Sequence, residues 1–235
     1  EAQRVLDAEI AAGRQLVATG FMRRFDPAHV AVKEAALSGA IGRPVLFRGI
    51  HRNAHAGPGL QRHLIVTGSA IHDIDSARWL LQQEVVEVFA RGLRVDPAVG
   101  EHAKDMLLVQ LALTGNCLAT IEVFVSARYG YEVIAEIVGD CGTAVTTPPG
   151  QAVLRQDRGC MTAVAGDWLD RFQDAYVLEL EQWIRSLRGS RFRGANAWDG
   201  YMSLLVARAC IASLESGRPE PVPPPALPAI YREEP

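Results

Sequence analysis

The chain has 235 residues, of which 49% are hydrophobic, and a formal net charge of −3 at neutral pH. This apolar content is enough to bury a substantial core, and it excludes an intrinsically disordered chain. The slightly acidic balance, with scattered basic residues that are nearly all arginine, argues against a general binder of nucleic acids or of membrane surfaces.

The start of the chain has the pattern of an α/β unit. Residues 1 to about 12 show helical spacing and stop at Gly13, and residues 15–21 follow as an apolar, buried strand. Helix, glycine and apolar strand in this order are typical of a parallel-sheet domain. Asp26-Pro27 then suits the N-cap and first position of a helix over about 27–39.

A strand, a loop and a second helix are predicted next. Residues 44–53 alternate as a strand, and residues 54–68 read as a long loop, a length often associated with function. The helix over about 69–81 has one apolar stripe, formed by Ala70, Ile74, Ala77 and Leu81. Its opposite side carries His72, Asp75, Ser76 and Trp79.

The rest of the chain predicts a sheet and the helices that back it. Five successive strands with turn residues between them are indicated over 84–93, 105–113, 116–127, 131–139 and 142–147. Helices follow over about 168–188 and 197–215, and the stripe from Phe172 to Leu187 is interpreted as core. Proline-rich 219–228 closes the chain as an extended tail. The predicted fold class is α+β, a large open sheet, mostly antiparallel, behind a small α/β stub.

Cysteine usage and the apolar runs exclude further classes. The four cysteines stand far apart and form no C-x-x-C, so neither a disulfide framework nor a structural zinc site is expected, and a cytoplasmic setting is predicted. The longest apolar runs, such as 106–113, are too short to span a bilayer. The chain opens with Glu1, without methionine or a visible signal peptide, and we expect it to start within a longer sequence.

His72 is the first candidate functional residue. Thr67, Gly68 and Ser69 all suit a helix cap, which places His72 in the first helical turn. Free N–H groups there are predicted to lower the pKa of the histidine and to favour the neutral imidazole, the form that accepts a proton. The alternative is a surface histidine capped by its own helix.

Other polar residues could share a pocket with His72. His51 and Asn53 lie on one face at the end of a strand, and Arg23-Arg24 could converge with them if that strand runs beside the helix. A rim of solvated polar residues is the alternative. A zinc site could be built from His51, His55, His63 and His72, but their spacing matches no ligand motif, so no metal is predicted.

Several kinds of chemistry have no support in the sequence. It contains no G-x-S-x-G nucleophile motif, no G-x-G-x-x-G and no P-loop. Asp73 and Asp75 stand two apart on a helix, do not face each other and are poor candidates for a paired-carboxylate mechanism.

Three segments, 20-GFMRRFDPAH-29, 51-HRN-53 and 69-SAIHDIDSARWLL-81, resemble in order and spacing the Gfo/Idh/MocA oxidoreductases, and among them the inositol 2-dehydrogenases. The resemblance runs from residue 1 to about 215. It implies a Rossmann domain that binds NAD(P), followed by a domain with a large open mixed sheet. Residues 1–21 would be the terminal helix and strand of the Rossmann domain, 22–218 the substrate-binding and oligomerisation domain, and 219–235 the tail.

The resemblance also implies residue roles. His72 would be the general base that takes a hydroxyl proton while a hydride passes to NAD or NADP. The substrate, a small cyclic polyol or sugar, would contact Met22, Arg23, His51, Asn53, Ser69 and Tyr131. Because the glycine-rich phosphate loop is absent, the chain alone is not expected to bind the nucleotide tightly. The sheet implies a homodimer or homotetramer.

Two further departures from the family pattern leave a second hypothesis open. Gly68 stands where an aspartate usually forms a dyad with the histidine, and neither Lys33 nor Lys104 has the context of the family's Glu-Lys-Pro lysine. The chain is therefore interpreted either as the C-terminal part of a polyol dehydrogenase or as a catalytically silent domain that keeps the fold and acts in binding or structure. A metal-dependent hydrolase ranks below both.

Overall fold

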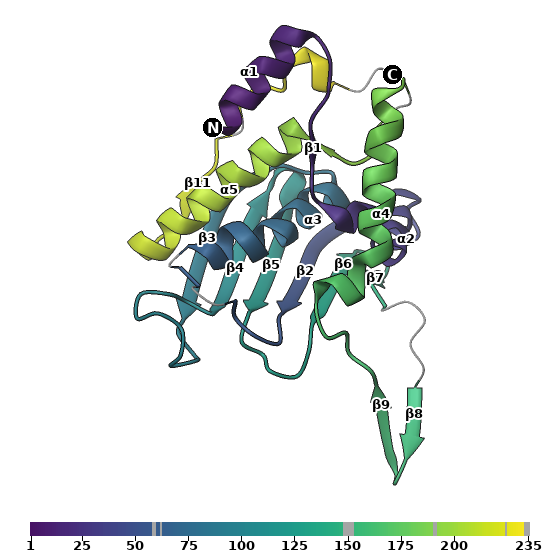
Figure 1. Cartoon of the computed structure of the whole chain (residues 1–235), viewed down its shortest axis with the longest axis vertical. Coiled ribbons are helices and arrows are strands. Elements are labelled where there is room, and N and C mark those ends of the chain that lie inside the picture. The colour runs from purple at the N-terminus through teal and green to yellow at the C-terminus, as the bar shows by residue number, and fades with distance from the viewer. Residues whose placement is uncertain (58–59, 62, 148–152, 190–191, 224, 233–235) are drawn as a thin grey trace.

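The centre of the molecule is a seven-stranded mixed sheet (Figure 1). The computed structural model describes residues 1–57, 60–61, 63–147, 153–189, 192–223 and 225–232. In spatial order the strands are β11 (Glu220–Pro221), β3 (Val85–Leu93), β4 (Met106–Leu113), β5 (Cys117–Phe124), β2 (Pro44–Arg52), β6 (Glu132–Gly139) and β7 (Thr143–Val145). The predicted α+β fold class, an open mixed sheet backed by helices, is confirmed.

Of the seven strands of this sheet, β2 comes first in the sequence, yet it lies in the interior of the sheet. It pairs in parallel with β5 and antiparallel with β6, and the other neighbours pair antiparallel. Near its end, His51 lies between Val123 of β5 and Val133 of β6. This register places a histidine at the carboxyl end of a central strand, which is where the candidate site lies.

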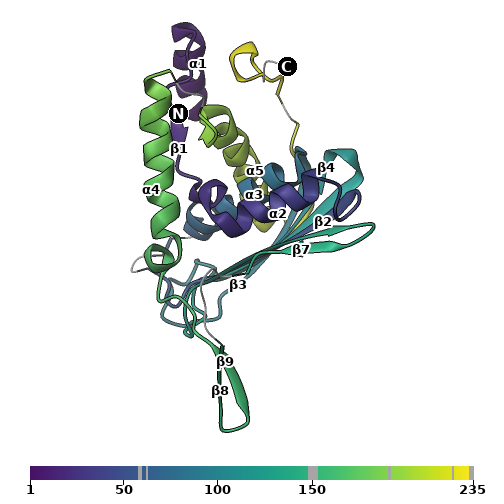
Figure 2. The same cartoon turned by 90° about the vertical axis from the view of Figure 1, so that its right-hand side faces the viewer.

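Three helices cover one face of the sheet: α2 (Pro27–Leu37), α3 (Ile71–Leu81) and α5 (Ala197–Ser216) (Figure 2). The main core lies between them and the sheet, with fully buried side chains such as Phe47, Ile74, Leu107, Ile121 and Val206. Helices α1 (Ala2–Ala12) and α4 (Trp168–Leu187) lie beside this layer. Burial alternates along β2 and β5 because the helices cover only one face of the sheet.

The second face of the sheet is covered by no element within the described ranges (Figure 2). Apolar side chains such as Leu108 and Leu118 are 48% and 58% exposed on it. They alternate with cross-strand ion pairs: Arg52 contacts Glu122 and Glu132, and Arg48 contacts Glu136. This surface is called the open face below.

The local signals at helix ends and strands were mostly correct. Asp26 caps α2 by accepting a hydrogen bond from the His29 backbone N–H, with Pro27 in the first turn. The five predicted strands after residue 84 all form, and the long helices span 168–187 and 197–216. Asn196 and Asp199 form a reciprocal capping box at the start of α5.

The beginning of the helix that carries His72 differs from the prediction. The loop predicted over 54–68 ends in a π-helical turn, η2 (Ile65–Ala70), which runs directly into α3; residues 58–59 and 62 of that loop lie outside the described residues. The Ile71 N–H is bonded to the carbonyls of Ser69 and Val66. Predicting a cap at residues 67–69 was therefore wrong, because the preceding turn already satisfies these donors.

The predicted buried strand over 15–21 was also wrong. Only β1 (Ala18–Thr19) is a strand, paired antiparallel with β10 (Ala195–Asn196), and Leu16 and Val17 are exposed. Apolar composition alone does not provide a neighbour to cover a segment.

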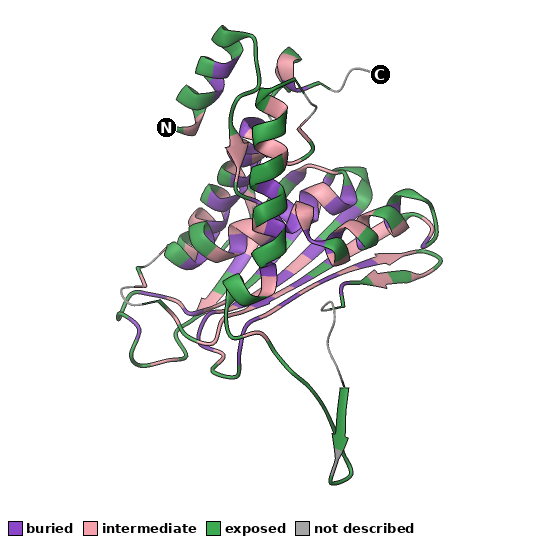
Figure 3. Ribbon diagram, turned by 45° about the vertical axis from the view of Figure 1, so that its right-hand side comes forward, coloured by how far each residue is buried: buried purple, intermediate pink, exposed green. Residues whose placement is uncertain are grey.

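Helix α4 is not core along the whole predicted stripe (Figure 3). Phe172 is buried, but Leu180 is 57% and Leu187 is 40% exposed. The buried residues of the helix, Phe172, Ala175 and Glu179, share one face, which packs against the turn η1 (Met22–Phe25), and Trp183 Nε1 donates to the Leu16 carbonyl. The other faces of its second half leave apolar side chains exposed, and α1 carries the exposed Val5 and Ile10.

The hairpin β8–β9 and the edge strand β11 were not predicted. The hairpin of β8 (Val153–Gln156) and β9 (Gly159–Thr162) projects from the body (Figures 1 and 3). The short strand β11 adds the start of the proline-rich tail to the edge of the sheet. The last short element is the turn η4 (Ala229–Tyr231). Residues 224 and 233–235 of the predicted tail lie outside the described residues.

Candidate active site at the end of the central strand

Arg23, His51 and Asp73 form a buried polar cluster from three separate elements. Arg23 Nη1 donates to Asp73 Oδ1 at 2.7 Å, and His51 Nδ1 lies 3.0 Å from Asp73 Oδ2. Arg23 is 2% and Asp73 0% exposed. Arg23 comes from η1, His51 from β2 and Asp73 from the first turn of α3, so the cluster joins these elements at one point.

A glycine in β2 makes room for the carboxylate. If Gly49 carried a Cβ, this atom would lie 3.2 Å from Asp73 Oδ1. That distance is tighter than ordinary van der Waals contact, so the small residue lets α3 approach the strand closely. Position 49 is therefore part of the structural support for the cluster.

The pKa directions agree with an ionised, hydrogen-bonded pair. Burial alone would raise the pKa of Asp73, but Arg23 and His51 hold it well below its usual range. Burial would likewise lower the pKa of Arg23, and Asp73 raises it above its ordinary value. Both charges therefore persist inside the protein at neutral pH.

The carboxylate also fixes the tautomer of His51. A carboxylate only accepts hydrogen bonds, so the short contact assigns the Nδ1 proton to the bond with Asp73 and makes Nε2 an acceptor. Arg23 Nη2 lies 3.2 Å from the same ring nitrogen and donates to Asp73 Oδ2 at 3.3 Å. His51 is therefore oriented by Asp73, and the neutral form of the ring has Nε2 as the nitrogen that can accept from another partner.

Tyr131 forms the next part of the wall. Its ring packs edge-on against His51 at 5.7 Å and against Phe172 of α4 at 6.2 Å. Burial raises the pKa of Tyr131 to about 12, although Arg23 opposes the shift. The phenol is therefore protonated at neutral pH and can donate a hydrogen bond.

His72 is neutral, as predicted, but not because of a helix terminus. Its pKa falls to about 3 because of burial first, and then because of the nearby Arg23 and His51. The ring packs edge-on against Phe21 at 5.6 Å. Its Nδ1 is buried and finds no hydrogen-bond partner in the described part of the chain.

The remaining predicted residues lie on the same elements. Met22 is buried on η1 and packs in one apolar cluster with Tyr131 and Phe172. Asn53 directly follows β2, and its buried Oδ1 lacks a hydrogen-bond partner among the residues described. Ser69 is partly buried on η2, three residues before His72.

The described contacts link five of the predicted residues. His51 contacts Arg23 and Tyr131, Met22 packs with Tyr131, and His72 is electrostatically coupled to Arg23 and His51. The contacts do not connect Asn53 or Ser69 to this group.

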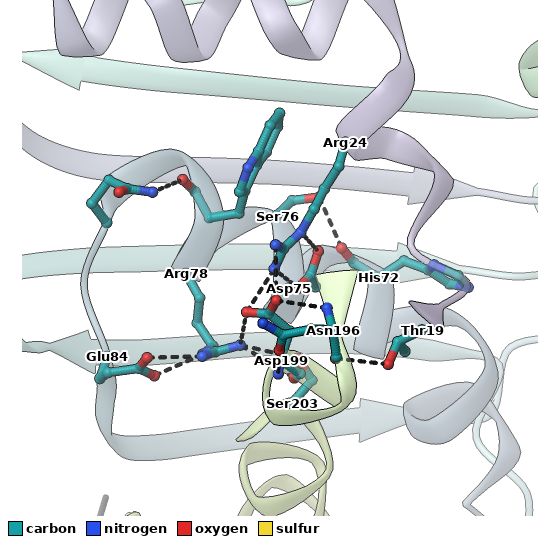
Figure 4. Close-up of polar contacts among 12 residues, drawn as sticks. Thr19, Arg24, His72, Asp75, Ser76, Arg78, Glu84, Asn196, Asp199 and Ser203 are labelled. Carbon is teal, nitrogen blue, oxygen red and sulfur yellow. Dashed lines mark hydrogen bonds and ion pairs between the residues drawn. The ribbon is translucent and has the colours of Figure 1, made fainter. Parts of the chain in front are cut away.

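A second polar network also uses a residue of η1 and residues of α3 (Figure 4). Arg24 donates to Asp75 through two nitrogens, at 3.0 and 2.6 Å, and to Asp199 of α5 at 3.0 Å. Arg78 donates to Glu84 at 2.7 and 2.8 Å and lies 3.8 Å from Asp199. In the figure the imidazole of His72 points away from these charges.

Sequence reasoning missed the two aspartates of α3. Periodicity placed Asp75 and Ser76 on the side away from the core, whereas both are buried with Asp73. The helix is enclosed on nearly all sides because η1 and α5 cover the face that is opposite the sheet. The usable signal was the matched pattern of Arg23-Arg24 with Asp73 and Asp75, one arginine for each carboxylate.

A metal centre finds no support in the described residues, where no group of three or more histidine, cysteine or acidic residues could hold an ion. His63 lies instead beside Glu215, with Nε2 and Oε1 3.5 Å apart. Nor does any described helix have the length and hydropathy needed to cross a bilayer.

Three helix starts of the domain do not fit a dinucleotide pyrophosphate. The N-termini of α2, α4 and α5 are capped by the side chains of Asp26, Asp167 and Asn196, with Asp199 completing the last cap. These acidic caps oppose a bound phosphate, and α3 continues directly from η2. None of these four helix starts offers a phosphate cradle.

Comparison with known proteins places this geometry in a family. Residues 33–223 match the model of the oxidoreductase family, C-terminal alpha/beta domain, of Gfo/Idh/MocA proteins. The chain belongs to the Gfo/Idh/MocA oxidoreductase family. The family domain thus includes η2, α3, the sheet and all of α5, and the resemblance seen in the sequence is confirmed.

Several relatives of the chain are named as inositol dehydrogenases. The chain is 48% identical to an inositol 2-dehydrogenase of Rubrobacter xylanophilus over 99% of its own length and 67% of the relative. It is 36% identical to an inositol 2-dehydrogenase of Klebsiella pneumoniae, covering 98% and 68%. A crystal structure of a Lactobacillus casei myo-inositol dehydrogenase with NAD(H) and myo-inositol superimposes with TM-score 0.91 at 30% identity, covering 98% and 69%. The chain is therefore a C-terminal domain of an oxidoreductase of the inositol dehydrogenase type.

Proposed function

We propose that this chain is the substrate-binding and assembly part of an NAD(P)-dependent dehydrogenase that oxidises a secondary hydroxyl of a cyclic polyol such as inositol. The observation that carries the proposal is the convergence on Arg23 of an oriented His51, a protonated Tyr131 and a neutral His72. Oriented acceptors and donors on one wall suit a ligand rich in hydroxyl groups.

The proposed chemistry assigns one task to each group. His51 Nε2 accepts a hydrogen bond from a substrate hydroxyl, because Nδ1 is held by Asp73. Tyr131 donates its phenolic proton to another hydroxyl oxygen, and Asn53 Oδ1 accepts from a third. His72 takes the proton of the reacting hydroxyl at Nε2, since its Nδ1 is buried. A nicotinamide nucleotide, when bound by a nucleotide-binding domain, accepts the hydride.

A specific observation favours a second candidate, a catalytically silent binding domain. The pKa of His72, about 3, makes this imidazole a weak base at neutral pH. Gly68 lies four residues earlier, one helical turn away, and has no side chain to pair with the unpartnered Nδ1. A domain with these properties could hold a polyol without transferring a hydride.

Binding of myo-inositol to the purified chain tests the shared part of both candidates. Isothermal titration calorimetry should show saturable binding, weakened about tenfold in His51→Ala because one charge-oriented hydrogen bond is lost. His63→Ala, a change at the surface next to Glu215, is the matched control and should bind like wild type. Absence of saturable binding by the wild-type chain would contradict the polyol site.

Nucleotide binding separates the domain from a complete enzyme. Titration with NADH, followed by nicotinamide fluorescence, should show no saturation in the micromolar range, because the sequence has no glycine-rich phosphate loop and the starts of α2, α4 and α5 are capped by their own side chains. Tight binding of NADH to this chain alone would contradict that assignment.

The two exposed apolar surfaces are proposed to be interfaces. We infer that the open face pairs with a second copy, since Leu108 and Leu118 expose apolar side chains there beside cross-strand ion pairs. The apolar surface shared by α1 and the second half of α4 would contact the nucleotide-binding domain. Sedimentation velocity at low micromolar concentration should give a dimer or tetramer, and a sharp monomer would contradict the pairing of open faces.

A further inference from the structure

Helix α4 carries one acidic side chain that the proposed chemistry does not use. Glu179 is 6% exposed, whereas Glu181, two residues further along the same helix, is half-exposed and pairs with Arg185. Oε1 of Glu179 is buried and accepts no hydrogen bond from any described residue. A carboxyl oxygen left in this condition is costly, so its persistence requires an explanation.

The position of Glu179 connects it to the candidate site. Residues 172, 175, 176 and 179 recur at helical spacing and share one face of α4. Phe172 and Ala175 pack with Met22 and Tyr131, and Tyr176 borders the same cluster. Glu179 continues this face by one turn, toward Phe21, whose ring contacts His72.

The charged surroundings of Glu179 are mixed, and no described residue forms an ion pair with its carboxyl. Burial is the main influence that raises its pKa, to about 7, and Asp75 on α3 raises it further. Arg24 on η1 and the backbone N–H of Phe21 lower the pKa but do not cancel the rise. Arg24 donates to Asp75 and Asp199 and forms no hydrogen bond with Oε1.

We propose that Glu179 is a substrate-binding residue of the candidate site, whose Oε1 accepts a hydrogen bond from a hydroxyl of the bound polyol. This inference rests on the proposed function and adds α4 as a wall facing α3. A hydroxyl group matches the need, because it donates one hydrogen bond to a buried oxygen without introducing a charge beside Arg24 and Asp75.

Two substitutions test the role on the full chain. Glu179→Leu should weaken binding of myo-inositol about tenfold in calorimetry, while the urea midpoint stays equal to or above that of wild type, because an unpartnered polar group has been removed. Glu179→Gln keeps an amide oxygen that accepts, and should bind within a fewfold of wild type. Glu181→Gln on the same helix is the matched control and should leave both values unchanged.

A measurement on the wild-type chain covers the case in which Glu179→Leu does not fold. The side-chain carboxyl ¹³C resonance of Glu179 should shift saturably as myo-inositol is added, with the resonance of Glu181 as control. An unmoved Glu179 signal, or unchanged affinity in Glu179→Leu, with binding still lost in His51→Ala, overturns this inference alone. No saturable binding by wild type overturns both this inference and the proposed polyol site.

Discussion

Two neighbouring arginines of η1 each pair with a buried aspartate, but only one of the two resulting networks has all its buried polar atoms hydrogen-bonded within the described residues. Arg23 pairs with Asp73 and Arg24 with Asp75, and all four side chains are nearly inaccessible to solvent. The Arg24 network closes on itself through Asp199, and no buried side-chain nitrogen or oxygen of Arg24, Asp75 or Asp199 lacks a partner in the described structure. The cluster around Arg23 does not close: Arg23 Nε and His72 Nδ1 both lack partners there.

The difference distinguishes a structural network from a binding wall. Buried polar groups are normally hydrogen-bonded, and a closed network mainly fixes how its elements pack. Here the Arg24 network holds η1, α3 and α5 in register, and so sets the position of His72 without touching its ring. The Arg23 cluster depends on that support, and its unpartnered polar atoms are the ones expected of the polyol-binding wall that we propose.

Removing Asp73 should cause the largest loss of stability. Asp73→Ala leaves the buried Arg23 without a carboxylate, so the free energy of unfolding should fall by about 3–5 kcal/mol in urea denaturation. In Asp75→Ala, Arg24 keeps Asp199 as a partner, so the loss should be smaller. Only Asp73→Ala should also change the ¹⁵N chemical shifts of the His51 ring, because Asp73 fixes its tautomer. The exposed Asp174→Ala is the control; a loss below about 1 kcal/mol in Asp73→Ala would refute the paired charges.

Acid should destabilise the protein through the neutral histidine of the site. The pKa of His72 is about 3 in the folded state, below the ordinary value of 6.5, so the unfolded chain binds the extra proton between these pH values. Stability contributed by His72 is complete above pH 6.5 and falls by about 2 kcal/mol at pH 5. Urea unfolding at both pH values should show a smaller loss in His72→Gln.

Glu179 should stabilise the protein as the pH falls, opposite to His72, and so tests the same explanation of the acid response. Its pKa is raised to about 7, so the folded state keeps the proton between about 4.5 and 7 and gains stability as the pH falls. Glu179→Gln should therefore steepen the acid-induced loss. An unchanged pH profile in both variants would show that these buried groups do not control the acid response.

A carboxylate at position 68 should give the unpartnered Nδ1 of His72 a hydrogen-bond partner. A Cβ at Gly68 would make only ordinary contacts, at 3.6 and 3.8 Å from Leu64, and the backbone there needs no positive φ. Gly68→Asp should raise the pKa of His72 by about one unit, equivalent to about 1.4 kcal/mol. The measurement is the imidazole NMR titration, with Gly68→Asn as the uncharged control; equal pKa values in both variants would exclude the dyad geometry.

The sequence predicted the parts of the fold that depend on local chemistry. Alternation identified the strands of the sheet, and the Asp26-Pro27 cap fixed the start of α2. His51 was placed at the end of a strand because the alternation over 44–53 was recognised, whereas the turn η1 that carries Arg23 was not predicted. Their convergence could only be hypothesised, since it depends on β2 pairing in the interior of the sheet.

The missed features depend on long-range packing. Asp75 was predicted to lie away from the core because a helical wheel does not reveal that η1 and α5 cover the outer side of α3. Glu179 was missed because it lies next to the stripe interpreted as core, of which Leu180 and Leu187 are exposed while Glu179 is buried. The low pKa of His72 was predicted in direction but attributed to a helix terminus that η2 removes.

The open face offers the same arginine–carboxylate chemistry with the smallest expected effect. The side chains of Arg48 and Glu136 are 57% and 25% exposed at a separation of 3.1 Å. Exposed pairs of this kind contribute about 0–1 kcal/mol, so Glu136→Gln should change the urea stability of a dissociated chain by less than 1 kcal/mol. If open faces pair, the same substitution lies in a desolvated interface and should weaken assembly in sedimentation equilibrium. Equal, small effects on both quantities would place this face in solvent and show that burial, rather than the identity of the ion pair, sets its energy.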